Sequence, residues 1–213
     1  MLFYRIVWWT VAKGSGLLYR VRIVGKERLP RSGGYVLAPS HRSMMEITLL
    51  ALVTKDRIRY MGKAEVFKIP VLGAIFSALG GFPVARDGTD RKAVRDSMAM
   101  LQAGERLAIF PEGTRQHGPK IQPLQPGAAY LALRAGVPIV PVGMAGTEEI
   151  MRSGRGRRPR FGRVVIVVGE PLLPPPRTTS AVPRAEVDAF TAQLAESLQQ
   201  AFDEAFEVRN GAD

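Results

Sequence analysis

Short apolar segments alternate with helical patterns along most of the chain, and this alternation constrains the fold more than any other feature. Strands are expected at residues 18–24, 35–38, 57–61, 82–85, 107–110, 139–142 and 164–168. Helices are expected at 44–53, 69–79, 90–102 and 126–135, and a C-terminal helix carries apolar residues on one face from Val187 to Ala205. Strands separated by helices are typical of layered α/β domains. We predict an α/β fold: a single layered domain with a mixed sheet flanked by helices.

The composition narrows the chemistry before any motif is considered. The 213 residues include 30 Lys and Arg against 19 Asp and Glu, a formal charge of +11, which favours polyanionic partners such as lipid headgroups or phosphorylated substrates. We expect no nucleic-acid partner, because zinc-finger spacing, basic heptads and ribonucleoprotein motifs are missing from the sequence. The sequence has no cysteine, which excludes a thiol nucleophile and a disulfide framework. With only two histidines, His41 and His117, we predict no metal site.

The first twelve residues are apolar and aromatic, with Trp8 and Trp9 between Arg5 and Lys13. This stretch is too short to cross a bilayer, which takes about 20 apolar residues. Paired tryptophans flanked by basic residues are typical of a helix that lies in the membrane interface. We therefore expect residues 1–16 to form an interfacial helix that binds an anionic membrane surface. The alternative is a helix that packs on the protein's own core.

A histidine at the end of the 35–38 strand is the sharpest chemical feature. His41 precedes Glu46 by five residues, so we expect His41 in the turn before a helix and Glu46 in its first turn. Histidine is suited to deprotonate an alcohol near neutral pH, and a carboxylate on its other ring nitrogen would fix the tautomer. Alternatively, Ser43 and Glu46 form a helix capping box and His41 is structural.

Three further segments follow strands or form them. Residues 110–115 are a Pro-Glu-Gly-Thr turn that ends in Arg115, with backbone N–H groups able to hold a phosphate or an oxyanion. Residues 80–87 place Arg86 after a short strand, where its planar guanidinium suits phosphate. Residues 137–142 form an apolar prolyl strand that can line an acyl tail. Each segment also has a simpler interpretation. Residues 110–115 can be an ordinary turn, Arg86 and Asp87 can form a surface pair, and residues 137–142 can be a core strand.

In this order, the four segments resemble the glycerolipid acyltransferase family, in particular bacterial 1-acylglycerol-3-phosphate acyltransferases of the PlsC type. His41 matches the family's His-x4-Asp block, and residues 81–86, 110–115 and 137–142 match the second, third and fourth blocks. The resemblance covers residues 20–173, and four blocks in order are far more specific than one. Two positions depart from the pattern: Glu46 replaces the usual aspartate, and Ser40 replaces a common asparagine.

The resemblance implies a catalytic pair and a set of substrate-binding residues. His41 is implied as the general base that Glu46 orients, with direct attack of the acceptor hydroxyl on an acyl thioester. Arg86 and Arg115, with Lys63 as a weaker candidate, are implied to bind the acceptor phosphate. The third block, with Glu112, Gly113 and Thr114, is tied to acceptor binding and to the oxyanion.

The implied activity is acyl transfer from acyl-CoA, or another acyl thioester, to lysophosphatidic acid or glycerol 3-phosphate in phospholipid biosynthesis. Acyl-CoA is a substrate, and no cofactor is expected. Residues 17–213 would form the acyltransferase domain, held peripherally at the cytoplasmic face of the cell membrane. Two alternatives are an acyltransferase for another lipid acceptor, such as a lyso-aminolipid or a glycolipid, and a non-catalytic basic protein that binds membranes.

Overall fold

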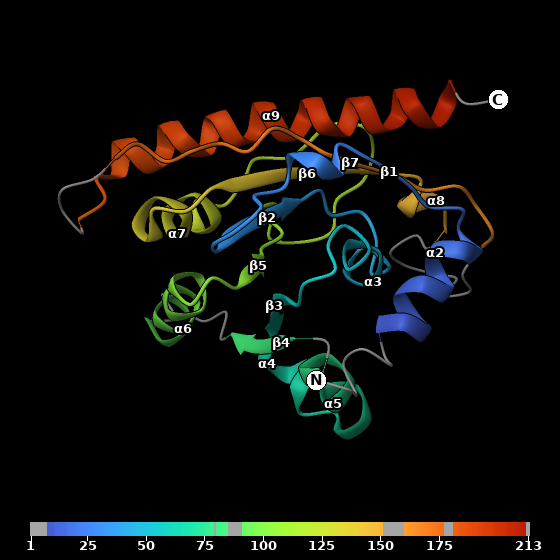
Figure 1. Cartoon of the computed structure of the whole chain (residues 1–213), viewed down its shortest axis with the longest axis horizontal. Helices are drawn as coiled ribbons and strands as arrows, with labels where there is room; N and C mark the ends of the chain where they lie inside the picture. The colour runs from blue at the N-terminus through green and yellow to red at the C-terminus, as the bar shows by residue number, and fades with distance from the viewer. Residues whose placement is uncertain (1–7, 79, 85–90, 151–159, 177–180, 212–213) are drawn as a thin grey trace.

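Seven strands form one mixed sheet in the computed structural model, which describes residues 8–78, 80–84, 91–150, 160–176 and 181–211. The sheet order is β1-β7-β6-β2-β5-β3-β4 (Figure 1). The strands are β1 (Arg22–Val24), β2 (Tyr35–Pro39), β3 (Ile58–Lys63), β4 (Gly81–Val84), β5 (Arg106–Ala108), β6 (Ile139–Ala145) and β7 (Val165–Val168). The predicted α/β class with a mixed sheet is confirmed.

The central strand β2 lies between β6 and β5 and is parallel to both. β3 is parallel to β5 and to β4, whereas β7 runs antiparallel to β6. Every residue of β2 is buried, as expected of a strand covered on both faces. Because side chains alternate along a strand, Tyr35 and Leu37 enter one core cluster and Val36 and Ala38 enter another.

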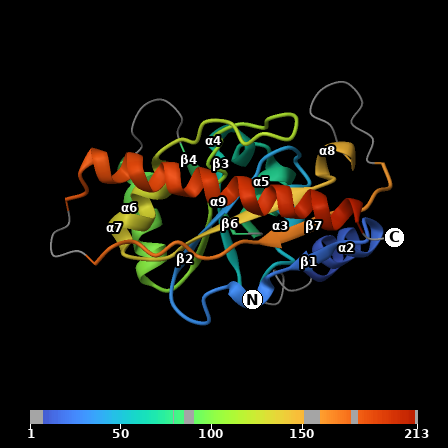
Figure 2. The same ribbon diagram turned by 90° about the horizontal axis from the view of Figure 1, so that it is seen from above.

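Helices cover both faces of the sheet. They are α3 (Glu46–Leu50), α4 (Ala64–Phe67), α5 (Pro70–Ala78), α6 (Arg91–Gln102), α7 (Gly127–Ala135), α8 (Thr147–Ile150) and α9 (Arg184–Asn210). The core cluster of one face includes residues of α6, α7 and α9, and that of the other face includes residues of α3. The long α9 runs over β6 and β7 (Figures 1 and 2), and its predicted apolar face is buried.

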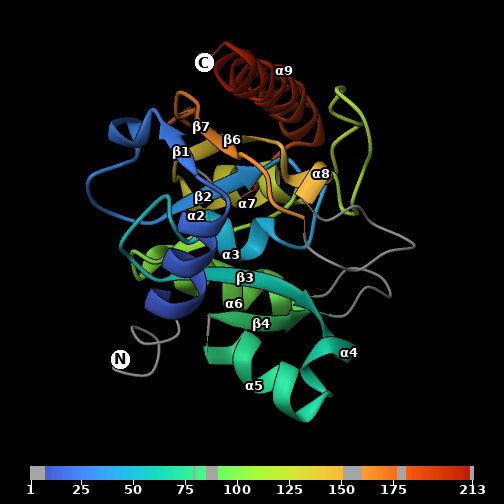
Figure 3. The same ribbon diagram turned by 90° about the vertical axis from the view of Figure 1, so that its right-hand side faces the viewer.

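Residues 8–18 are helical and lie beside α3 (Figure 3). A π-helix, η1 (Trp8–Lys13), continues into α2 (Gly14–Leu18), so the expected boundary at residue 16 falls inside a helix. The strand predicted for 18–24 is therefore too long: it begins only at Arg22, because the backbone turns at Arg20 with a φ of 44°. Leu17 is 84% exposed. Within the described ranges, none of the helices has both the length and the apolar character needed to cross a membrane.

The other predicted elements are found with shifted ends. The helix predicted for 44–53 is confined to α3, and the helix at 126–135 is confirmed as α7, closed by Gly136 in the left-handed conformation. The short helices α4 and α8 were not predicted. Residues 85–90, which include Arg86, and residues 151–159 lie outside the described residues.

Candidate active site

The candidate site lies where β2 and β5 end side by side. These strands are parallel, with Leu37 opposite Ala108, so the same register continued beyond the strands brings His41 level with Glu112. Carboxyl ends of parallel strands are where open α/β sheets place their sites. The adjoining Ser40 is buried and bonded to β6: its backbone N–H donates to the carbonyl of Val142 at 3.0 Å, and its Oγ accepts the N–H of Met144 at 3.1 Å.

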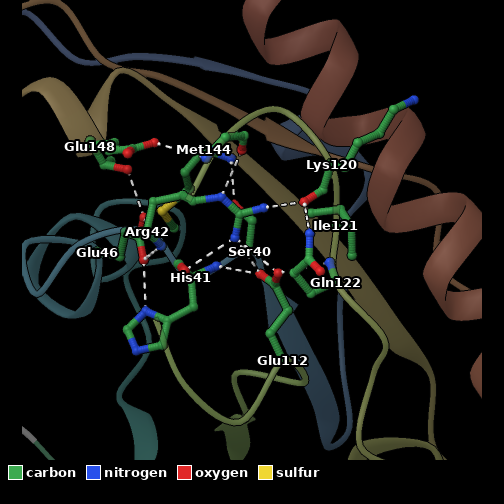
Figure 4. A network of polar contacts seen from close by, with 12 residues as sticks. Ser40, His41, Arg42, Glu46, Glu112, Lys120, Ile121, Gln122, Met144 and Glu148 are labelled. Atoms are coloured by element: carbon green, nitrogen blue, oxygen red, sulfur yellow. Dashed lines mark hydrogen bonds and ion pairs between the residues drawn. The ribbon is translucent and has the colours of Figure 1, made fainter. Parts of the chain in front are cut away.

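His41 and Glu46 form the predicted pair. Nδ1 of His41 lies 2.9 Å from Oε2 of Glu46, and the imidazole ring packs against Phe110 with 4.1 Å between ring centroids. An ionised carboxylate only accepts hydrogen bonds, so Nδ1 carries the proton and Nε2 keeps its lone pair. The ring points away from the polar cluster behind it (Figure 4), and its side chain is 14% exposed. His41 therefore has the tautomer and the exposure that a general base needs.

Glu46 is not the reaching member of a capping box. The N-cap residue of α3 is Met45, without a side-chain hydrogen bond, and the Glu46 carboxylate accepts the N–H of Arg42 at 2.9 Å to each oxygen. Its Oε1 also accepts the hydroxyl of Thr147 at 2.6 Å. The longer glutamate therefore reaches His41 from the first turn of α3, and its carboxylate is completely buried.

A buried ion pair lies behind His41 (Figure 4). Nη1 of Arg42 donates to both carboxylate oxygens of Glu112, at 2.7 and 2.9 Å, and the two side chains are 1% and 0% exposed. Glu112 Oε1 also accepts the N–H of His41 at 2.9 Å, and Oε2 accepts the N–H of Gln122 at 3.1 Å. Direct binding of an acceptor by Glu112 would therefore require these bonds to rearrange.

The loop after the third block wraps around the same arginine. Arg42 donates to the carbonyls of Gly118 and Lys120 at 3.1 and 2.9 Å, and its guanidinium lies over the ring of Phe202 in α9. Gln199 of α9 accepts the N–H of Ile121 at 2.8 Å. These contacts fix the loop to α9, and the loop in turn fixes the segment that carries His41.

The substrate-binding residues implied by the resemblance differ in their exposure and in their hydrogen bonding. Gly113, in the left-handed conformation with a φ of 72°, donates its N–H to the carbonyl of Phe110 at 3.1 Å, so this N–H is not available to an oxyanion. Thr114 and Arg115 are exposed on the loop that follows. Lys63 is the last residue of β3, and β4, which precedes Arg86, ends beside it at Val84. Arg86 itself lies outside the described residues.

Sequence reasoning missed two residues, Arg42 and Thr147, that contact the His41–Glu46 pair (the dyad) from behind. Arg42 resembles a surface arginine in the sequence, and Thr147 lies beyond the four blocks. The sequence offers one indication for both residues: each follows the end of a strand, β2 or β6, that lies in the interior of the sheet. Among the described residues, no group of three or more side chains is suited to hold a metal ion; the expectation of a metal-free reaction stays a prediction.

The fold and the His41–Glu46 contact suit an α/β enzyme, and comparisons with known proteins identify the family. The family model described as acyltransferase matches residues 20–145. The chain is 30% identical over 156 residues to a 1-acyl-sn-glycerol-3-phosphate acyltransferase of Bacillus subtilis, covering 71% of this chain and 73% of the relative. The chain belongs to this acyltransferase family.

Two further relatives extend the comparison. A chloroplastic 1-acyl-sn-glycerol-3-phosphate acyltransferase of Brassica napus is 32% identical over 158 residues, which are 72% of this chain but only 45% of the plant protein. The crystal structure of the 1-acyl-sn-glycerophosphate acyltransferase PlsC from Thermotoga maritima superposes with a TM-score of 0.75. It has 23% sequence identity and covers 94% of this chain and 78% of that one. The likeness to this structure supports the same fold.

Proposed function

We propose that this protein transfers a fatty acyl group from acyl-CoA, or another acyl thioester, to the free hydroxyl of lysophosphatidic acid. The observation that carries the proposal is the His41–Glu46 pair at 2.9 Å, with Nε2 of His41 free to accept a proton. The names of the relatives support the acceptor class. Glycerol 3-phosphate is the second candidate acceptor, because the same phosphate contacts would serve it.

The reaction would proceed without a covalent acyl-enzyme. Nε2 of His41 takes the proton of the acceptor hydroxyl while the hydroxyl oxygen attacks the thioester carbonyl. The tetrahedral intermediate then collapses, the C–S bond breaks, and the imidazolium returns the proton to the departing thiolate. Glu46 stabilises the imidazolium that forms in between. Because the sequence has no cysteine, it supports this direct route over one in which the acyl group is first transferred to a cysteine thiol of the enzyme.

The acceptor phosphate would bind Arg115 and Arg86, with Lys63 nearby. Arg115 is exposed on the loop after Glu112, and the ends of β3 and β4 lie on the same edge of the sheet as His41, because these strands are parallel to β5 and β2. A net charge of +11 supports attraction to an anionic lipid surface, and we propose that the protein works peripherally at the cytoplasmic face of the membrane.

A panel assay tests the proposal. Purified protein is mixed with acyl-CoA or acylated carrier protein and with lysophosphatidic acid, glycerol 3-phosphate, a lyso-aminolipid or a glycolipid, and products are identified by mass spectrometry. Phosphatidic acid from lysophosphatidic acid is the expected product. Exclusive acylation of an acceptor without phosphate would overturn the phosphate assignment, and thioester consumption with none of them would favour a different acceptor class.

A further inference from the structure

Thr147 is buried at the start of α8, and its hydroxyl donates to Oε1 of Glu46 at 2.6 Å. The two residues are 101 positions apart in the chain, and Thr147 lies just beyond residue 145, where the match to the family model ends. It therefore belongs to none of the four sequence blocks, yet it touches the carboxylate on which the orientation of His41 depends.

The surrounding structure holds Thr147 firmly in place. It follows Gly146, whose φ of 88° brings its backbone against the carbonyl oxygen of Arg163; a Cβ there would lie 2.3 Å from that oxygen. The next two residues anchor α8 from outside, because Glu149 pairs with Arg209 of α9 and Glu148 contacts His117. These contacts place the hydroxyl of Thr147 against Glu46.

The contacts of Glu46 show what this hydroxyl adds. The N–H of Arg42 is equally distant, at 2.9 Å, from both carboxylate oxygens, so it holds the group without selecting a rotation. The terminal torsion of a glutamate is broad, and the extra methylene relative to aspartate adds another torsion to be fixed. Thr147 binds Oε1 alone, and this leaves Oε2 directed at Nδ1 of His41.

We propose that Thr147 is a positioning residue for the proposed acyl transfer: it fixes the carboxylate of Glu46 so that one oxygen faces His41, and it thereby enables a glutamate to take the place of the family's aspartate. Thr147 touches neither substrate nor the reacting atoms. The effect on turnover rests on the proposed function, but the effect on the His41 tautomer does not and can be measured without any reaction.

The kinetic experiment compares a variant that lacks the Thr147 hydroxyl with one that keeps it. Thr147→Val keeps the side-chain shape and should lower kcat about tenfold to a hundredfold, the range expected for one hydrogen bond to a charged group, with the KM of both substrates little changed. Thr147→Ser keeps the hydroxyl and should retain most of the activity. Thr191→Val is the matched control: its hydroxyl bonds the carbonyl of Val187 within α9, so turnover should equal that of the unaltered protein.

The spectroscopic arm uses the fact that the chain has only two histidines. Nitrogen-15 NMR of the imidazoles, assigned with His117→Asn, should find Nδ1 of His41 protonated in the neutral ring of the unaltered protein. In Thr147→Val the ring should shift toward a mixture of tautomers, and in Thr147→Ser it should not. If Thr147→Val does not fold, Thr147→Ala deletes the hydroxyl without adding a methyl group and is measured instead.

The two arms separate the possible failures. An unchanged tautomer together with unchanged kcat in the folded hydroxyl-deletion variant overturns the positioning role. A lower melting temperature with an unchanged tautomer also overturns it, because Thr147 would then be merely structural. A shifted tautomer in a protein that acylates no acceptor in the panel keeps the positioning role and refutes the proposed function instead.

Discussion

Replacing Glu46 by glutamine tests the dyad with almost no change in shape. In the structure, the N–H of Arg42 lies 2.9 Å from both carboxylate oxygens of Glu46, whereas the hydroxyl of Thr147 donates to Oε1 alone. The glutamine amide would therefore place its oxygen there and turn its NH2 group toward Nδ1 of His41. That nitrogen would have to accept a hydrogen bond, so the ring proton would move to Nε2, where the lone pair of the base is needed.

Two comparisons bracket the expected fall in kcat of the Glu46→Gln variant. Losing one hydrogen bond to a charged group costs about 1.5–3 kcal/mol, which is roughly a tenfold to more than a hundredfold loss of rate. The wrong tautomer adds to this, and the equivalent Asp→Asn change in a serine-protease triad lowers kcat about 10⁴-fold. We expect Glu46→Gln to lower kcat by about 10²–10⁴ and Glu46→Asp to retain activity well above glutamine.

The assay is initial-rate acyl transfer under saturating substrates, with melting temperatures measured in parallel. Glu196→Gln, on the exposed side of α9, is the matched control and should have normal kcat. A fully active and folded Glu46→Gln variant would refute the reasoning, because a glutamine can bond Arg42 and Thr147 but cannot stabilise an imidazolium.

Three further predictions follow from the site and the surface. Arg42→Met should lower the free energy of unfolding by about 3–5 kcal/mol in urea titrations, because it leaves the buried charge of Glu112 unpaired; a loss below about 1 kcal/mol contradicts this. Arg115→Ala should raise the KM for the acceptor about ten- to hundredfold with little change for the thioester, and equal losses for both substrates would argue against a phosphate contact. Replacing Trp8 and Trp9 by serine should reduce cosedimentation with anionic vesicles, and binding should weaken as salt rises; unchanged sedimentation would place the anchor elsewhere.

The sequence predicts those parts of the fold that depend on local pattern. Strand β2 and helix α7 follow from apolar runs and from Gly136, and the five-residue spacing places Glu46 correctly in the first turn of α3. It does not predict the strand order, since pairing between β2, β5 and β6 joins segments far apart in the chain. The strand expected from residue 18 begins late, because Leu18 belongs to α2 and the backbone turns at Arg20 before β1 starts.

The same distinction applies to the site. The contact between His41 and Glu46 is local and could be predicted, whereas Arg42 meets Glu112 across 70 residues and Thr147 meets Glu46 across 101. A sequence pattern carries no sign that an arginine will be buried, because burial depends on the partner that the fold supplies. The family resemblance ties Glu112 to acceptor binding, whereas in the structure its carboxylate accepts hydrogen bonds from Arg42 and from the backbone N–H groups of His41 and Gln122.

The most direct test of the central claim, that His41 is the base, is the kcat of His41→Ala in acyl transfer to lysophosphatidic acid. The side chain is partly exposed and lies just beyond the end of β2, so the variant should fold with a normal circular dichroism spectrum. General-base catalysis contributes about 10²–10⁴-fold, and we predict a fall in kcat of at least this size. A folded His41→Ala protein with kcat within about tenfold of normal, well below that range, would contradict the mechanism.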